Sequence, residues 1–232
     1  VSMTGKIDTD NSRNRLKHKP LHDFIYKLSE STTGKQRKQI EELADDLYRV
    51  KRFEVDESRF EKEGYEFVPF FYGHNFNENV VFPESFQGTS VMTISPFIDT
   101  KTLQDLNSRL GKNGKSVLVT RGEYVTDKVL GLFNKDNDEV WIVNDQMANN
   151  DIASVDLHAK TYMVVGPKND GASIYLYMGS ANATSAAFHK NTEILIRLKL
   201  RRGQMVLDKF RKEFLQINDN NESLVYERLN AP

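Results

Sequence analysis

The residues of this sequence that are best equipped for chemistry lie in three short stretches of its second half. The stretches are Asp156-Leu-His-Ala-Lys160, Met178-Gly-Ser-Ala-Asn-Ala-Thr184 and Asn191-Thr-Glu193. The first stretch reads as part of a strand, in which His158 and Lys160, two residues apart, project from the same face. The ammonium of Lys160 then has to pair with a negative group or bind an anion, because an unpaired buried ammonium is costly.

The other two stretches supply complementary groups. The Gly-Ser-Ala-Asn segment comes where a strand meets a predicted short helix, Ala181 to Phe188, and such a junction presents backbone N–H groups to a phosphate oxygen. Glu193 opens the next predicted strand, where its carboxylate can accept a hydrogen bond from an imidazole. Together the stretches offer an imidazole, a cation, an amide, a hydroxyl and a carboxylate. These groups can attack a phosphodiester and stabilise the charge of its transition state.

The composition excludes several other kinds of chemistry and location. The 232 residues include no cysteine, which excludes disulfides, thiolate catalysis and cysteine-based zinc sites. The formal net charge of -1 gives no overall basic field for nucleic acid, and the basic runs at 13–19 and 197–202 are interpreted as solvated segments. No uncharged apolar run approaches the roughly 20 residues of a membrane span, and the first residues lack the apolar core of a signal peptide. We therefore expect a cytoplasmic protein without stable membrane insertion.

Strands and helices are expected to alternate in the second half of the chain. Short apolar runs predict buried strands at 91–95, 116–120 and 140–143, with helices at 102–110 and 124–133 between them. Further strands are expected at 157–165, 173–178 and 193–200. Asn169-Asp-Gly171 is a hairpin signal between the first two of these. A final amphipathic helix is expected to place Leu207, Phe210 and Phe214 on one face.

This alternation predicts an α/β fold, an α-β-α sandwich around a mixed, largely parallel sheet. The predicted lobe comprises residues 88–232. Residues 1–87 are expected to form a polar tail over 1–19, two helices around 21–28 and 40–50, and an extended connection that includes a strand near Glu66.

The three stretches resemble the HKD signature of the phospholipase D superfamily. The resemblance rests on the His-Ala-Lys segment, the Gly-Ser-Ala-Asn segment and the downstream Glu193. Ile94-Ser-Pro-Phe-Ile98 also resembles the strand that begins a catalytic lobe in that superfamily. The resemblance covers residues 88–215. A lone HxK is a weak signal, whereas HxK followed at this distance by GSxNxT and then Glu is specific.

The resemblance implies a metal-independent phosphodiesterase that needs no cofactor. His158 is then either the nucleophile that forms a phosphohistidine or the acid that protonates the leaving group. Lys160 and Asn182 hold the non-bridging phosphate oxygens, and Glu193 orients a histidine. The phosphate-binding support is assigned to Ser180, Gly179 and Thr184. No metal is expected, because lysine and asparagine supply the charge stabilisation that magnesium gives elsewhere.

The substrate is expected to be nucleic acid. The superfamily pattern has an aspartate five residues after the lysine, where this chain has Val165, and some nuclease and DNA-repair members lack that aspartate. Two alternatives stay open: a phospholipase or phosphatidyl transferase acting on lipid, and a non-catalytic lobe that binds or dimerises.

A superfamily active site needs two HKD sets, and this sequence contains one. The remaining histidines lack the HxK spacing and are interpreted as surface or structural residues: His18, His22, His74 and His189. Either a homodimer mate supplies the second set, or the chain is the second lobe of a longer protein. We favour the second lobe, in which His158 would be the acid.

Overall fold

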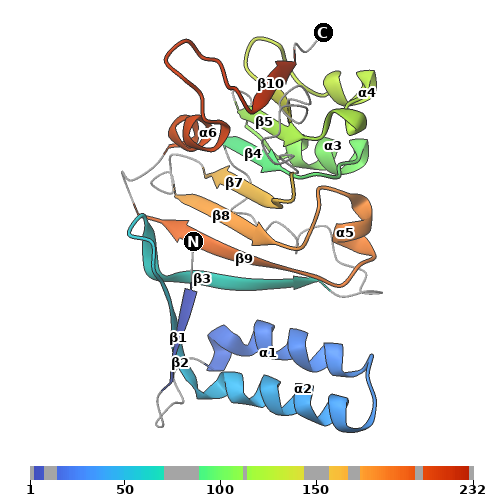
Figure 1. Ribbon diagram of the computed structural model, residues 1–232, viewed down its shortest axis with the longest axis vertical. Coiled ribbons are helices and arrows are strands. Elements are labelled where there is room, and N and C mark those ends of the chain that lie inside the picture. Colours follow the sequence, from blue (N-terminus) through green and yellow to red (C-terminus); the bar gives the residue numbers. More distant parts are fainter. Residues whose placement is uncertain are drawn as a thin grey trace.

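The computed structural model describes residues 3–7, 15–70, 89–111, 114–143, 157–166, 173–201 and 206–229. Its centre is an eight-stranded sheet in the order β10-β6-β5-β4-β7-β8-β9-β3. Helices lie on both faces of this sheet (Figure 1). The predicted class, an α/β fold with a mixed sheet between helices, is confirmed. Asp156, His74 and the hairpin signal at 169–171 lie outside the described residues.

The parallel part of the sheet comes from three strands of mostly buried residues, β4 (Ser90–Ile94), β5 (Lys115–Thr120) and β6 (Glu139–Val143). Between them lie α3 (Thr100–Ser108), the 3-10 turn η3 (Gly122–Tyr124) and α4 (Asp127–Leu130). The helix predicted at 124–133 is therefore shorter than expected. Thr126 starts it by accepting a hydrogen bond from Val129 N, and Gly131 ends it.

The rest of the sheet is antiparallel. It consists of β7 (Thr161–Val165), β8 (Ile174–Gly179), β9 (Glu193–Leu200), β3 (Phe60–Phe70) and β10 (Tyr226–Leu229). The expectation of a largely parallel sheet is wrong, because among the described strand pairs β4–β5 and β5–β6 alone are parallel. One physical reason is the connection from β7 to β8. Residues 166–173 are too few for a parallel crossover, which needs about a dozen residues or more.

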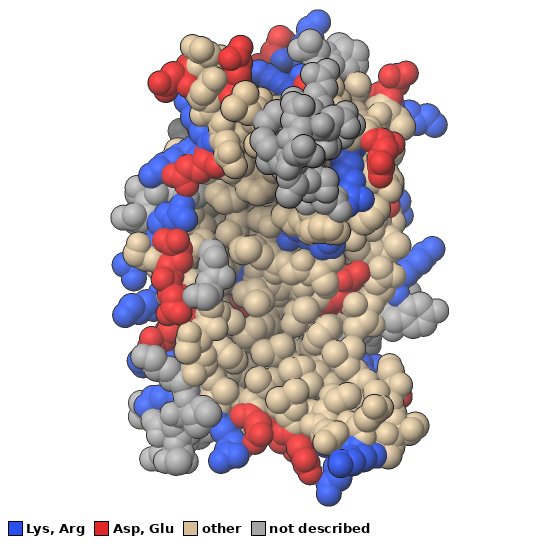
Figure 2. All heavy atoms as spheres, in the orientation of Figure 1, with Lys and Arg blue, Asp and Glu red and all other residues tan. Residues whose placement is uncertain are grey.

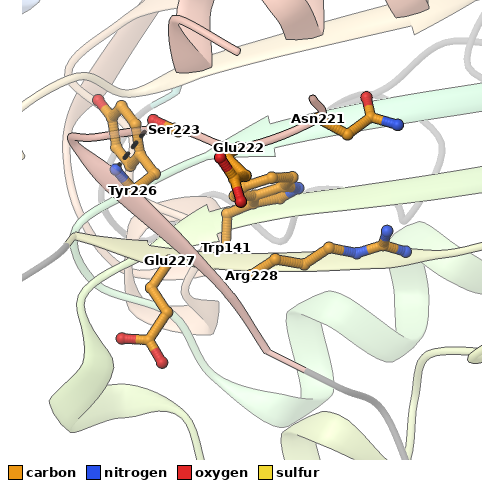
Figure 3. A pocket seen from close by; sticks show the side chains of 7 residues that line it. All are labelled: Trp141, Asn221, Glu222, Ser223, Tyr226, Glu227 and Arg228. Atoms are coloured by element: carbon orange, nitrogen blue, oxygen red, sulfur yellow. Dashed lines mark hydrogen bonds between the residues drawn. The ribbon is translucent and has the colours of Figure 1, made fainter. Parts of the chain in front are cut away.

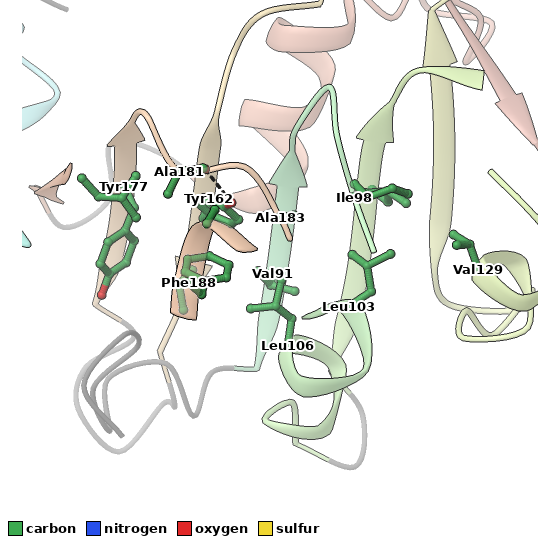
Figure 4. Close-up of a cluster of buried hydrophobic side chains, with 14 of the residues drawn as sticks. Val91, Ile98, Leu103, Leu106, Val129, Tyr162, Tyr177, Ala181, Ala183 and Phe188 are labelled. Atoms are coloured by element: carbon green, nitrogen blue, oxygen red, sulfur yellow. Dashed lines mark hydrogen bonds between the residues drawn. The ribbon is translucent and has the colours of Figure 1, made fainter. Parts of the chain in front are cut away.

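Each face of the sheet has its own hydrophobic core, because successive side chains of a strand point to opposite faces. On β7, Tyr162 and Val164 belong to one cluster, and Met163 belongs to the other. The first cluster packs against α3, α4 and the short helix α5 (Ser185–His189) (Figure 4). The second packs against α6 (Leu207–Leu215). The site described below is therefore supported by buried residues on both sides.

The N-terminal part of the chain joins the sheet at its β3 edge. Its elements are β1 (Met3–Ile7), α1 (Arg15–Ser29), α2 (Gly34–Asp46), the 3-10 turn η1 (Leu47–Arg49) and β2 (Val50–Val55). The expectation of a polar tail over residues 1–19 is wrong, since β1 pairs with β2 and α1 begins at Arg15. The five residues of β1 are too few to show a periodic pattern. His18 on α1 is buried and its Nε2 lies 2.8 Å from the hydroxyl of Tyr65 on β3. The predicted boundary at residue 87 lies outside the described residues, and β3 on its N-terminal side completes the sheet.

Charges of both signs are distributed over the molecule. Figure 2 shows Lys and Arg side chains interspersed with Asp and Glu around the rim of one face, and uncharged residues over its middle. This mixture fits the formal net charge of -1. Attraction of a polyanion would therefore have to come from local groups. None of the helices within the described ranges is long and apolar enough to span a membrane.

Candidate active site

The chemically equipped stretches meet at one edge of the sheet, on the side of α3 and α5 in Figure 1. β4 ends at this edge, and Ile94 lies opposite Thr161, so the residues just before β7 lie there too. β8 ends there because Met178 also lies opposite Thr161. β9 begins there because Leu195 lies opposite Gly179. We call this the site edge, and it carries the described residues of all three stretches.

His158 and Lys160 precede β7 and are not part of it, so the prediction of a strand from residue 157 is wrong in its start. β7 begins at Thr161 because its partner β4 ends at Ile94, and a turn through Pro96 follows. The His158 side chain is exposed and that of Lys160 is partly buried. The Lys160 ammonium donates to the backbone carbonyl of His158 at 3.0 Å. The two residues thus form one local unit at the rim of the sheet.

Gly179 allows the backbones of β8 and β9 to approach closely. A Cβ at this position would lie 2.0 Å from the carbonyl oxygen of Ile194. Gly179 N also donates to the carbonyl of Lys160 at 3.2 Å. Gly179 therefore lets the Lys160 segment and the start of β9 lie against the same turn. Any side chain at this position would push β8 and β9 apart.

Ser180 fastens this turn to β9. Its N–H donates to Ile194 O at 3.0 Å, and its Oγ accepts from Ile194 N at 3.0 Å. Ile194 follows Glu193, so the serine hydroxyl holds the segment that carries the carboxylate. The structure thus gives Ser180 a backbone partner, and its predicted support of phosphate stays a prediction.

Asn182 and Thr184 occupy the next positions of the turn. Asn182 Oδ1 lies 3.5 Å from Ser95 Oγ, at the limit of a hydrogen bond. The hydroxyl of Ser95 donates to Phe97 O at the shorter distance of 2.7 Å. Thr184 Oγ1 accepts from Ala187 N at 3.2 Å and so caps α5. Asn182 is held weakly by its carboxamide, whereas Thr184 has a structural role as a helix cap.

Two buried residues that the sequence reasoning missed shape the site edge. Ser95, immediately after β4, accepts from Ala183 N at 2.9 Å. Tyr162 is fully buried, and its hydroxyl donates to Ala181 O at 2.9 Å (Figure 4). Both therefore fix the backbone on either side of Asn182. The Ser-Pro pair at the end of a predicted strand was the one sequence signal for Ser95.

Glu193 lies at the start of β9, as predicted, with a partly buried side chain. Its Oε1 accepts from Asn191 Nδ2 at 3.2 Å. Burial raises the pKa of Tyr162 well above its usual value, and the negative charge of Glu193 adds to the rise. The carboxylate of Glu193 thus lies within electrostatic reach of the tyrosine beneath the turn.

Asp99 ties α3 to α5 below the site edge. Its carboxylate accepts from Thr102 N at 2.8 Å and from Ser185 N. Burial alone would raise the pKa of Asp99, but the hydrogen bonds from Ser185 and Thr102 outweigh it and lower the pKa. The turn from Ser180 to Thr184 is therefore anchored at both ends.

The other described histidines lie elsewhere. His18 is buried beside β3, His22 stacks on Tyr48 with ring centroids 4.4 Å apart, and His189 is exposed at the end of α5. A pocket at the β10–β6 end of the sheet is also separate from the site edge (Figure 3). Its lining residues include none of the predicted site residues: Trp141, Asn221, Glu222, Ser223, Tyr226, Glu227 and Arg228.

Comparison with known proteins gives likenesses of structure alone. No family model and no curated protein match the sequence. NucT from Helicobacter pylori is 15% identical with a TM-score of 0.46, and the match covers 66% of this chain and 96% of NucT. Nuc, a phospholipase D family member from Salmonella typhimurium, is 16% identical with a TM-score of 0.45, and the match covers 72% of this chain and 99% of Nuc. Phosphatidylserine synthase from Haemophilus influenzae is 12% identical with a TM-score of 0.47, and the match covers 91% of this chain and 53% of the synthase. All three TM-scores lie below 0.5, so the chemistry is argued from the residues of the site edge and not from these likenesses.

Proposed function

We propose that this chain supplies one half-site of a metal-independent phosphodiesterase that acts on nucleic acid. The observation that carries the proposal is the meeting of His158 and Lys160 with Asn182 and Glu193 at the site edge. The hydrogen bond from Gly179 N to Lys160 O joins the first two to the turn that carries Asn182. The pairing of Ser180 with Ile194 joins the same turn to the start of β9.

Each group has a role that its chemistry suits. The exposed imidazole of His158 can attack phosphorus, forming a P–N bond as the P–O bond to the leaving group breaks. In the other half-site, a histidine gives its proton to the leaving oxygen. His158 can serve in either role. The ammonium of Lys160 and the carboxamide of Asn182 donate hydrogen bonds to the non-bridging oxygens, where negative charge grows in the transition state.

A second histidine has to come from another lobe or another copy of the chain. Among the described residues, His18 and His22 are engaged with tyrosines of the N-terminal part, and His189 lies on α5. A twofold arrangement that brings two site edges together would supply both a nucleophile and an acid.

Val165 stands where the superfamily pattern has an aspartate, but this position does not lie at the site edge. Val165 ends β7 opposite Ser90 and Ile174, at the far end of the strand from His158. Its side chain packs against the cluster below α6. Nucleic acid remains the favoured substrate, on the resemblance to nuclease and DNA-repair members that also lack an aspartate at this position.

The test is hydrolysis of bis-(p-nitrophenyl) phosphate in excess EDTA. If two copies of the chain complete the site, we expect wild-type activity to survive the chelator, and to fall by about 10²- to 10⁴-fold in His158→Ala, since that is the usual contribution of an acid or base group. A wild-type chain that is inactive at every concentration would place the second HKD set in another lobe. His189→Ala is the matched control and should behave as wild type, because His189 is an exposed residue at the end of α5 and is not one of the proposed site residues. A rate per chain that rises with protein concentration would indicate that a second copy completes the site. Loss of activity in EDTA, or an unchanged rate in His158→Ala, would contradict the proposal.

A further inference from the structure

Three residues that the catalytic proposal does not use form a cluster at the site edge. Phe97 follows β4, and Arg121 and Tyr124 follow β5. β4 and β5 are parallel neighbours, so their carboxyl ends bring these residues together. The carboxyl ends of strands in open α/β sheets are where such folds bind ligands.

The contacts within this cluster are specific. The guanidinium carbon of Arg121 lies 5.1 Å from the centroid of the Phe97 ring. The Phe97 and Tyr124 rings meet edge to face, with centroids 5.3 Å apart and an interplanar angle of 73°. Such cation–π and T-shaped geometries fix the orientation of the Phe97 ring. The cluster is therefore an ordered surface.

The cluster is also joined to the catalytic segment. Arg121 Nη2 donates to the carbonyl oxygen of Leu157 at 3.5 Å, and Leu157 immediately precedes His158. Leu157 itself is buried, so this carbonyl has a fixed position. A ligand group that lies over Phe97 and Arg121 would thus be adjacent to the phosphate held at His158.

The Phe97 ring lies outside both hydrophobic cores and contacts Tyr124, which packs against one of them. It is 38% exposed and belongs to neither of the two clusters that support the sheet. Ile98, the next residue, is buried and pairs with Ala183. The chain thus presents an aromatic ring outward at a position whose neighbour already completes the packing.

We infer that Phe97, Arg121 and Tyr124 form a subsite for an unpaired nucleobase next to the scissile phosphate. This inference rests on the proposed phosphodiesterase function and names its substrate as single-stranded nucleic acid. An aromatic ring offers the flat face on which a base stacks, whatever its sequence. An arginine beside it adds a cation for the base or the neighbouring phosphate. An acyl chain would instead require a continuous apolar groove, which the guanidinium of Arg121 beside the Phe97 ring interrupts.

The test is binding of fluorescently labelled oligothymidine to the full chain, measured by anisotropy at low salt. A second probe is an abasic oligonucleotide of the same length, which keeps the phosphates and lacks the bases. We expect Phe97→Leu to weaken oligothymidine binding by roughly tenfold, the usual loss when one stacked base is released. Binding of the abasic probe should stay unchanged. Tyr26→Leu is the matched control, because Tyr26 is an exposed aromatic residue on α1. This helix lies beyond the β3 edge of the sheet, away from β4 and β5 (Figure 1).

The outcomes separate this inference from its rivals. No binding of oligothymidine by wild type, equal binding by Phe97→Leu and Tyr26→Leu, or equal weakening of both probes would each overturn it. Anionic phosphatidylserine vesicles form the third arm. A loss of vesicle binding in Phe97→Leu without a loss of oligothymidine binding would assign the surface to lipid and overturn the inference. These binding assays do not depend on hydrolysis, so the nucleobase subsite and the catalytic proposal can fail independently of each other.

Discussion

A side chain at Gly179 should separate the two strands that form the site edge. In Gly179→Ala the new Cβ would lie 2.0 Å from Ile194 O and 2.9 Å from Leu195 Cα. Ordinary van der Waals contact begins at 3.4 Å, so the strands have to move apart by the difference of 1.4 Å. The atoms in the way belong to the backbone of β9, which cannot rotate aside as a flexible side chain would.

The size of the effect follows from what that movement breaks. The two hydrogen bonds between Ser180 and Ile194 are each 3.0 Å long and cannot survive such a separation. Each contributes about 0.5 to 1.5 kcal/mol net, and overpacking costs about 1 to 3 kcal/mol more. We therefore expect the free energy of unfolding to fall by about 2 to 6 kcal/mol. The free energy of unfolding of a typical domain is about 5 to 15 kcal/mol, so the variant should still fold and its unfolding should be measurable.

Urea unfolding followed by the fluorescence of Trp141, the single tryptophan, measures this change. Gly111→Ala is the matched control, because a Cβ at Gly111 would meet nothing within 4 Å. If Gly179→Ala and Gly111→Ala unfold at the same urea concentration, the reasoning from the close strand approach is refuted. Phosphodiesterase activity should also fall in Gly179→Ala alone, since the displaced turn carries Asn182.

Two further predictions concern buried polar groups. Tyr162→Phe leaves the carbonyl of Ala181 without its donor at 2.9 Å, so we expect a loss of about 1 to 3 kcal/mol in urea unfolding and a lower hydrolysis rate. Glu139 pairs with Lys115 and Arg211, both at 2.7 Å. Burial alone would raise the pKa of Glu139, but hydrogen bonds and charges from these partners lower it below 4.5. Its stabilisation is therefore present above pH 4.5 and disappears as the pH falls through the lowered pKa. Glu139→Gln should cost about 3 kcal/mol at pH 7 and less at pH 3, and an equal loss at both pH values would contradict the assignment.

The buried strands could be predicted from the sequence because their signal is local. The strand expected at 193–200 is β9 with the same bounds, and those expected at 116–120 and 140–143 differ from β5 and β6 by one residue at the start. Apolar residues in an unbroken run need burial whatever the partner strand is. The direction of pairing is local only where a short turn joins two strands, as the hairpin signal at 169–171 indicated for β7 and β8. The other antiparallel pairs join strands separated by longer connections, and they were not predicted.

At the site edge, too, local features could be predicted and contacts between remote residues could not. The types and spacing of His158, Lys160 and Asn182 indicated phosphodiester chemistry before any geometry was known. The supports of these residues were not predictable, because they come from remote positions. Ser95 lies 87 positions from Asn182, and nothing in its own neighbourhood reports that contact. The start of β7 at Thr161 likewise depends on where β4 ends.

The structure also divides the motif itself into two kinds of residue. Gly179 permits the close approach of β9, Ser180 pairs with its backbone, and Thr184 caps α5. These three positions have structural reasons for their residue type, so a loss of activity on their substitution does not by itself identify a catalytic group. Asn182 differs, because its carboxamide has one weak contact at 3.5 Å among those described. On the proposed function, this carboxamide lies at the same edge of the sheet as the exposed His158 so that it can bind the phosphate.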